Sequence, residues 1–194
     1  MEWLRLVRVE WIGAERLGRA PFLVVANHPS LIDTPLLTCQ MQQADFLVSA
    51  AWSENPFLRH AARSSGYLRA DRGAKVVRDA VERLRAGRTV VVFPEGTRSP
   101  AGGLGRFHRG AAHIALETGC DIVPMVIHVE PRVLMKGQFW ADVPERRPVF
   151  RVEVGDPIRV ADTLDGSESR PLAARRLTGL LQDYFEKRWT RGTG

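Results

Sequence analysis

A histidine and an aspartate five residues apart, His28 and Asp33, are the first side chains in the sequence whose types suit acid–base chemistry. They follow the apolar run Phe22 to Ala26, so His28 lies at the C-terminal end of a predicted strand, where open α/β sheets bind ligands. Pro29 keeps His28 extended and suits the first position of a helix, which we expect to begin directly after the histidine. With His28 outside that helix and Asp33 within it, the carboxylate can reach one imidazole nitrogen and leave the other free to accept a proton. The pair also fits a histidine that caps a helix, with Asp33 placed for the helix dipole.

A second chemical segment follows a later apolar run and reads Phe93-Pro-Glu-Gly-Thr-Arg-Ser. Gly96 allows a ligand to approach the backbone closely, Thr97 offers a hydroxyl group, and Arg98 offers a planar fork that matches a phosphate. Because Glu95 would repel a phosphate, we expect it to pair with an arginine or to face a neutral hydroxyl. Taken alone, the segment equally fits a glycine-rich turn with solvated arginines.

Together, the two segments resemble the principal motifs of the glycerolipid acyltransferase family, which is typified by bacterial 1-acylglycerol-3-phosphate acyltransferases. Residues Gly66 to Arg72 (GYLRADR) stand where that family has an intermediate motif, and Ile122 to Met125 (IVPM) resemble its fourth, proline-containing motif. The resemblance covers about residues 7 to 130, with all four motifs in the family's order. The intermediate motif departs from the pattern, because Arg69 and Ala70 replace an apolar pair, and this departure bears on the acceptor pocket.

The resemblance implies transfer of a fatty acyl group from an acyl carrier protein or coenzyme A thioester to a hydroxyl of a lysophospholipid-like acceptor, with 1-acylglycerol-3-phosphate as the main candidate. It implies that His28 is the general base and that Asp33 orients it. The acceptor's phosphate would be bound by Gly96, Thr97 and Arg98 together with Arg72, and Glu95 is placed in the same substrate-binding set. No metal and no cofactor beyond the acyl thioester co-substrate is expected.

The elements that position these residues alternate along the chain between short apolar runs and helical patterns, which predicts a single α/β domain over residues 1–194 with a mostly parallel central sheet flanked by helices. The predicted strands are Val7 to Ile12, Phe22 to Ala26, Phe46 to Ser49, Thr89 to Phe93, Ile122 to Ile127 and Phe150 to Val154. The predicted helices lie near Ser30 to Gln40, Pro56 to Arg63, Ala74 to Ala86 and Gly110 to Thr118, with an amphipathic helix at about 171–189. Gly87 and Gly119 are expected to adopt left-handed conformations at helix ends. The stripe of Leu177, Leu180, Leu181 and Tyr184 on the last helix fits docking on the sheet or, alternatively, contact with a membrane surface.

Composition and charge narrow the class of protein. The 194 residues carry 28 Lys and Arg against 22 Asp and Glu, a net charge of +6 that suits an anionic partner or simply a soluble domain. The two cysteines are far apart and predict neither a zinc site nor a disulfide framework. No apolar run approaches the roughly 20 residues that span a bilayer, and charged residues interrupt the N-terminus. We therefore expect a cytoplasmic protein, peripheral on the cytoplasmic face of the membrane, with Trp3, Leu4, Phe139 and Trp140 among the side chains that contact lipid.

Three other functions compete with this interpretation. The same site could serve a specialised lipid or polyene pathway with a different acceptor, or could hydrolyse a thioester if water replaced the acceptor. A serine hydrolase is disfavoured, because the sequence lacks a Gly-x-Ser-x-Gly segment. A nucleic-acid-binding domain would suit the positive charge, but the sequence lacks the interleaved aromatic and basic strands of common RNA-binding modules.

Overall fold

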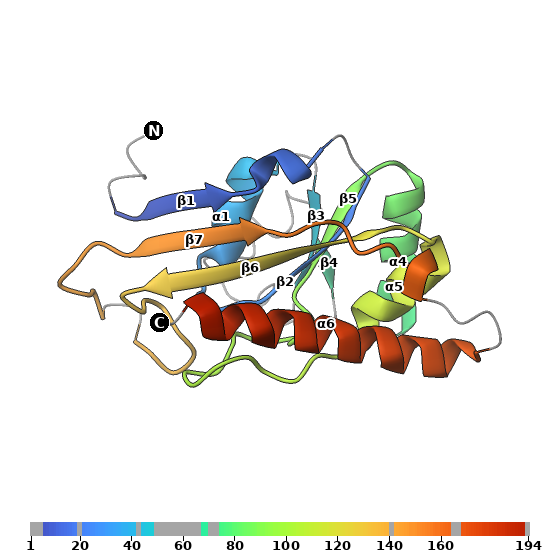
Figure 1. Ribbon diagram of the computed structural model, residues 1–194. Coiled ribbons are helices and arrows are strands. Elements are labelled where there is room, and N and C mark those ends of the chain that lie inside the picture. The colour runs from blue at the N-terminus through green and yellow to red at the C-terminus, as the bar shows by residue number, and fades with distance from the viewer. Residues whose placement is uncertain are drawn as a thin grey trace.

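A seven-stranded sheet forms the centre of the protein, with the strand order β1-β7-β6-β2-β5-β3-β4 (Figure 1). The computed structural model describes residues 6–18, 21–41, 44–48, 67–69, 74–139, 142–163 and 168–192. The strands are β1 (Arg8–Ile12), β2 (Leu23–Ala26), β3 (Ala44–Val48), β4 (Leu68–Arg69), β5 (Thr89–Val92), β6 (Ile122–Glu130) and β7 (Val149–Val154). The helices are α1 (Asp33–Gln40), α4 (Ala74–Arg85), α5 (Gly110–Thr118) and α6 (Arg170–Gly192), with short 3-10 helices η2 (Ala14–Arg16) and η4 (Ala161–Thr163).

The pairing of the strands confirms a mostly parallel α/β sheet. All neighbouring strands run parallel except β6 and β7, which are antiparallel over Met125–Glu130 and Val149–Val154. The six predicted strands agree with the observed ones to within a few residues, although β6 extends three residues beyond the expected end at Ile127. The two-residue strand β4 was not predicted. The expected helix from Pro56 to Arg63 lies outside the described residues.

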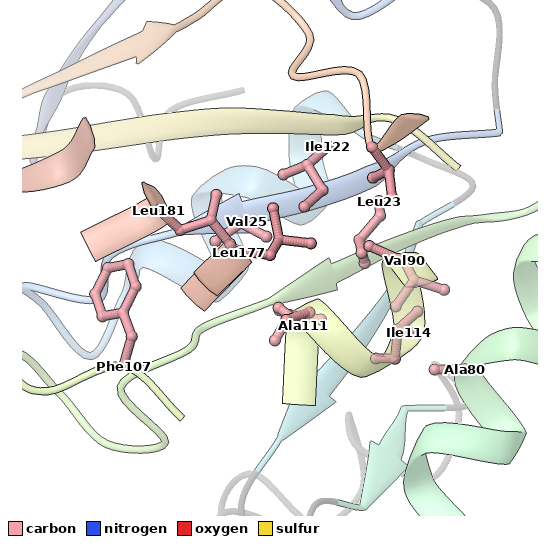
Figure 2. Packing of buried hydrophobic residues seen from close by; sticks show 14 of the residues in the cluster. Leu23, Val25, Ala80, Val90, Phe107, Ala111, Ile114, Ile122, Leu177 and Leu181 are labelled. Atoms are coloured by element: carbon pink, nitrogen blue, oxygen red, sulfur yellow. The ribbon is translucent and has the colours of Figure 1, made fainter. Parts of the chain in front are cut away.

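Each central strand is buried on both faces, which explains its continuous apolar sequence. On β2, Leu23 and Val25 pack into one apolar cluster, whereas Val24 and Ala26 pack into the other. The first cluster lies beneath α4, α5 and α6 and includes Ile114, Leu177 and Leu181 (Figure 2). The second cluster lies on the face that packs against α1 and includes Leu37, Phe46 and Met125. Because side chains alternate along a strand, the side chain of His28, two positions after Ala26, lies on the same face as Val24 and Ala26, which is the face that packs against α1.

Helix α6 docks on the sheet rather than leaving its predicted stripe free. Leu177 and Leu181 are each 2% exposed, and Tyr184 packs against the same cluster, whereas Leu180 points outward and is 45% exposed. The alternative of a membrane-facing stripe is therefore wrong for Leu177 and Leu181, because both side chains are already part of the core.

Helix ends follow the predicted glycine positions. Gly87 after α4 has φ 79° and Gly119 after α5 has φ 67°. Both values lie in the left-handed region that glycine adopts without a Cβ clash, as the sequence predicted.

Candidate active site

His28 and Asp33 meet at the end of β2, as their spacing predicted. The imidazole Nδ1 lies 2.9 Å from Asp33 Oδ2. The His28 ring stacks on Phe93, which follows β5, with 4.4 Å between ring centroids and 20° between planes. His28 Nε2 makes no hydrogen bond to any described residue, and 13% of the side chain is exposed. The ring is therefore held by one nitrogen and one face, with its second nitrogen available to an incoming group.

The chain on either side of His28 is also tied down. Asn27 is fully buried, its Nδ2 donates to the Ile127 carbonyl at 2.9 Å, and its Oδ1 accepts from the Ile127 N–H at 2.7 Å. This side chain thus continues the pairing of β2 with β6 by one position beyond Ala26. No role was predicted for Asn27 from the sequence, although an amide next to the histidine, with one donor and one acceptor, was the available signal.

The first helix begins later than expected, at Asp33 rather than directly after the histidine. The Asp33 Oδ2 atom accepts from the Ser30 N–H at 2.7 Å as well as contacting His28, and the Asp33 N–H donates to the Ser30 carbonyl at 3.3 Å. Residues 30–32 therefore form a turn, and Pro29 is not the first helical residue. This turn, rather than a longer helix, brings the carboxylate back to the imidazole.

Burial makes Asp33 an unusual carboxyl group. Its side chain is completely buried, and Oδ1 has no hydrogen-bond partner among the described residues. Loss of hydration raises the pKa of Asp33, while the hydrogen bond and charge of His28 and the Ser30 N–H oppose the rise. The carboxyl group thus depends on His28 as its main compensating partner.

Glu95 is buried beneath the site and is fully occupied by the protein. Its Oε1 accepts from Ser99 Oγ at 2.6 Å and from the His28 N–H at 3.1 Å, and its Oε2 accepts from the Gly105 N–H at 2.6 Å. Of the two partners expected for Glu95, an arginine or a neutral hydroxyl, the structure shows the hydroxyl. The carboxylate connects the backbone of His28 to the loop after β5, and the Ser99 N–H adds a bond to the His28 carbonyl at 2.7 Å.

The remaining residues of the second segment line the same end of the sheet. Gly96 and Thr97 are exposed, and Gly96 has φ 66° with the His108 ring close to its Cα. Arg98 is partly buried, and its Nη1 donates to the carbonyls of Leu134 and Met135, both at 2.9 Å. Its Nε and Nη2 atoms make no hydrogen bond to the described residues. Nη1 of the guanidinium group is thus used within the protein, whereas Nε and Nη2 are available to a ligand.

One predicted site residue has no described position. Arg72 lies outside the described residues, and the intermediate motif from Gly66 to Arg72 is described only at 67–69. In the described part of the chain, no group of three or more His, Cys, Asp or Glu side chains is arranged to hold a metal ion.

Comparison with known proteins agrees with this geometry. The profile of the Acyltransferase family matches residues 8–128, which is more than half of the chain and contains His28, Asp33 and the loop after β5. The chain belongs to the Acyltransferase family. Its relatives include a 1-acyl-sn-glycerol-3-phosphate acyltransferase of Borreliella burgdorferi, which is 27% identical over 194 residues covering 96% of this chain and 73% of the relative.

Other acyltransferase relatives differ in the acceptor that their names state. A 1-acyl-sn-glycerol-3-phosphate acyltransferase of Pseudomonas aeruginosa is 26% identical over 140 residues, or 69% of this chain and 52% of the relative. A lyso-ornithine lipid O-acyltransferase of the same species is 34% identical over 113 residues, or 56% of this chain and 43% of the relative. This acyltransferase chain thus spans about a third to a half of the length of several curated relatives that it matches.

The fold is shared with a solved acyltransferase. The crystal structure of the 1-acyl-sn-glycerophosphate acyltransferase PlsC from Thermotoga maritima matches with a TM-score of 0.72 and 24% identity, covering 99% of this chain and 74% of that chain. The similarity confirms the predicted fold class for this acyltransferase.

Proposed function

We propose that this acyltransferase moves a fatty acyl group from a thioester to the free hydroxyl of 1-acylglycerol-3-phosphate. The observation that carries the proposal is the His28–Asp33 pair at the carboxyl end of β2, with Nδ1 2.9 Å from Asp33 Oδ2 and no described partner on Nε2. A histidine held in this way presents one defined nitrogen to a substrate hydroxyl. The proposal is supported by relatives whose names state this activity.

In the proposed mechanism, His28 Nε2 accepts the proton of the acceptor hydroxyl as its oxygen attacks the thioester carbonyl carbon. Asp33 holds Nδ1–H and stabilises the imidazolium ion that forms. The tetrahedral intermediate then collapses, the carbon–sulfur bond breaks, and the imidazolium returns its proton to the leaving thiolate. The products are the ester and the free thiol of an acyl carrier protein or coenzyme A, which are the proposed donors.

The acceptor's phosphate is assigned to the loop after β5. Arg98 retains Nε and Nη2 for a bidentate contact, and Thr97 is an exposed residue that carries a hydroxyl group. The Gly96 N–H already donates to the Phe93 carbonyl at 3.0 Å, so Gly96 is assigned to close approach of the ligand rather than to donation. Arg72 of the intermediate motif is proposed as a further cation for the same phosphate. Glu95 is not needed as a ligand, since both its oxygens already accept hydrogen bonds within the protein.

A lysolipid with another head group is the second candidate acceptor. It is favoured by the lyso-ornithine lipid O-acyltransferase relative, whose name states a different acceptor. Hydrolysis of the thioester by the same histidine is the third possible outcome of an activity test.

The proposed place of action is the cytoplasmic face of the membrane. None of the helices in the described ranges is long and apolar enough to cross a bilayer. The connection between β6 and β7 exposes Phe139 at 61% and Val143 at 83%, beside the exposed cations Arg146 and Arg147. This connection lies at the end of β6 that points the same way as the end of β2 (Figure 1). Trp3, Leu4 and Trp140, which were also expected to contact lipid, lie outside the described residues.

Sedimentation with vesicles tests the membrane proposal. We expect the protein to bind anionic phosphatidylglycerol vesicles and to dissociate as salt rises, because charge attraction is screened over roughly 8 Å at physiological ionic strength. Changing Phe139 and Val143 together to Ser should weaken binding. Leu172→Ser is the matched control, because Leu172 is 51% exposed but lies at the opposite end of α6 from this connection (Figure 1). Equal loss in both variants would contradict the assignment of this surface.

A product screen tests the activity. Purified protein is incubated with acyl carrier protein or coenzyme A thioesters and with lysophosphatidate, other lysolipids or water, and products are identified by mass spectrometry. We expect phosphatidate as the main product and no product with His28→Ala. His113→Ala, which removes an exposed histidine on α5, is the control and should keep the parental rate. Parental activity in His28→Ala would refute the proposed base, and free fatty acid as the main product would indicate a thioesterase.

A further inference from the structure

Three consecutive residues, Val133 to Met135, lie beyond the region matched by the family profile and accept hydrogen bonds from two parts of the candidate site. These parts are the turn after His28 and the loop after β5. Ser30 Oγ donates to the Val133 carbonyl at 2.9 Å, and the Leu31 N–H donates to the Leu134 carbonyl at 3.1 Å. Both donors belong to the turn between His28 and Asp33. From the other segment, Arg98 donates to the carbonyls of Leu134 and Met135. All three carbonyls thus accept hydrogen bonds from residues of the candidate site.

The segment is also anchored from behind. The Met135 side chain is 4% exposed and packs in the apolar cluster on the α1 face of the sheet. Its N–H donates to Gln138 Oε1 at 2.7 Å, and the Gln138 N–H returns a bond to the Met135 carbonyl at 3.1 Å. The carbonyls that Arg98 contacts therefore have defined positions.

Leu134 adopts an uncommon backbone conformation at this point. Its φ of 53° lies in the left-handed region, and it is the only non-glycine residue with positive φ among the described residues. Such conformations persist where surrounding bonds impose them and occur often at functional sites. Here the imposed conformation places the Leu134 carbonyl within reach of both Leu31 and Arg98.

We propose that Leu134 is a positioning residue for substrate recognition, whose left-handed backbone holds the Arg98 guanidinium so that Nε and Nη2 face the acceptor's phosphate. The inference rests on the proposed function, because that function assigns Arg98 to the phosphate. An arginine side chain has several rotatable bonds, and ordering it when a ligand binds costs conformational entropy. Two hydrogen bonds from Nη1 to backbone carbonyls order the side chain before the ligand binds, which lowers that cost. Acceptor affinity should then depend on the backbone at Leu134 rather than on its side chain.

Two substitutions at Leu134 separate the backbone from the side chain. Leu134→Gly removes the side chain but adopts positive φ without strain, whereas Leu134→Val keeps an apolar side chain whose β-branch strongly disfavours positive φ. We expect Leu134→Gly to keep the acceptor KM within about twofold of the parent, and Leu134→Val to raise it about tenfold. The KM for the thioester and the kcat should change little in either variant.

Gly119→Val provides a control outside the anchored segment. Gly119 follows the last residue of α5, has φ 67° and nothing within 4 Å of an added Cβ, and is not bonded to Arg98. This variant imposes a similar backbone penalty away from Leu134 and Met135. It should leave the acceptor KM unchanged.

The test is completed by isothermal titration calorimetry of the parent and each variant with hexanoyl lysophosphatidate and with its phosphate-free monoglyceride. The rate of acyl transfer is measured on the same proteins. We expect Leu134→Val to weaken only the phosphate-bearing probe. The inference would be overturned if Leu134→Gly and Leu134→Val had equal effects or if Leu134→Val had none. It would also be overturned if both probes lost affinity equally or if Gly119→Val caused the same loss. If the parent binds the probe but transfers no acyl group, the proposed function fails while the binding comparison still decides the inference. Absence of binding to the parent overturns both.

Discussion

Replacement of Glu95 by Gln distinguishes a bracing role from substrate contact. The Glu95 side chain is 4% exposed, and its two oxygens accept from three donors, namely Ser99 Oγ and the backbone N–H groups of His28 and Gly105. A glutamine has one acceptor oxygen and one donor amide group. In one orientation the new amide faces Gly105 N–H, and in the other it faces the His28 N–H. In the first orientation the Gly105 N–H loses its acceptor, and in the second the His28 N–H keeps only Ser99 Oγ, at 3.2 Å.

The magnitude follows from these contacts. A hydrogen bond to a charged group contributes about 1.5 to 3 kcal/mol, and a buried donor left unpaired costs about 1 to 3 kcal/mol. Because the two effects overlap, we expect Glu95→Gln to lower the free energy of unfolding by about 2 to 4 kcal/mol. In a chain of this length, that loss lowers the midpoint of thermal unfolding by roughly 4 to 16 °C. Turnover should fall as well, since the displaced N–H belongs to the proposed base.

The assay combines urea unfolding, followed by circular dichroism, with kcat and acceptor KM. Glu117→Gln is the matched control, because Glu117 is 41% exposed and, among the described residues, pairs only with the surface arginines Arg85 and Arg170. Exposed pairs of this kind contribute about 0 to 1 kcal/mol. If Glu95→Gln unfolds like Glu117→Gln and raises only the acceptor KM, the bracing role is refuted and Glu95 contacts substrate.

Two further substitutions test the catalytic pair and the phosphate contact. Asp33→Asn should lower kcat but retain more activity than His28→Ala, because the base remains while the anion opposite it is lost. Burial raises the pKa of Asp33 above its ordinary value of 3.8. Between these two pKa values the folded protein keeps a proton that the unfolded chain has released. The free energy of unfolding therefore falls as pH rises from about 3.8 through the raised pKa. In Asp33→Asn this fall should disappear from the pH dependence of unfolding, and its persistence would contradict the assigned cause. Arg98→Ala should weaken a phosphate-bearing acceptor by about 1.5 to 3 kcal/mol in kcat/KM and spare a phosphate-free acceptor, whereas equal losses would indicate a structural role.

Local sequence was sufficient to predict the elements that depend on near neighbours. The apolar runs of β2 and β5 are continuous because these strands are buried on both faces, and such runs can be recognised in the sequence alone. Gly87 and Gly119 mark helix ends for a similar reason, since positive φ is a local property of glycine. The meeting of His28 with Asp33 is also local, since five residues separate them, although a turn at residues 30–32 brings them together rather than the helix expected to begin directly after His28.

Contacts between distant segments were decided only by the tertiary structure. The donors that occupy Glu95 come from positions 28, 99 and 105, so a charge that looked available to substrate is used to join two loops. Arg98 meets carbonyls 36 and 37 residues away, and backbone carbonyls leave no mark in the sequence because every residue has one. The stripe on α6 is similar, because helical periodicity groups Leu177, Leu180 and Leu181 on one side. Only the packing of the helix shows that Leu177 and Leu181 join the core while Leu180 remains exposed. Sequence therefore determined the local elements and the pairing of His28 with Asp33, whereas packing between remote segments determined which polar groups remain free to bind a ligand.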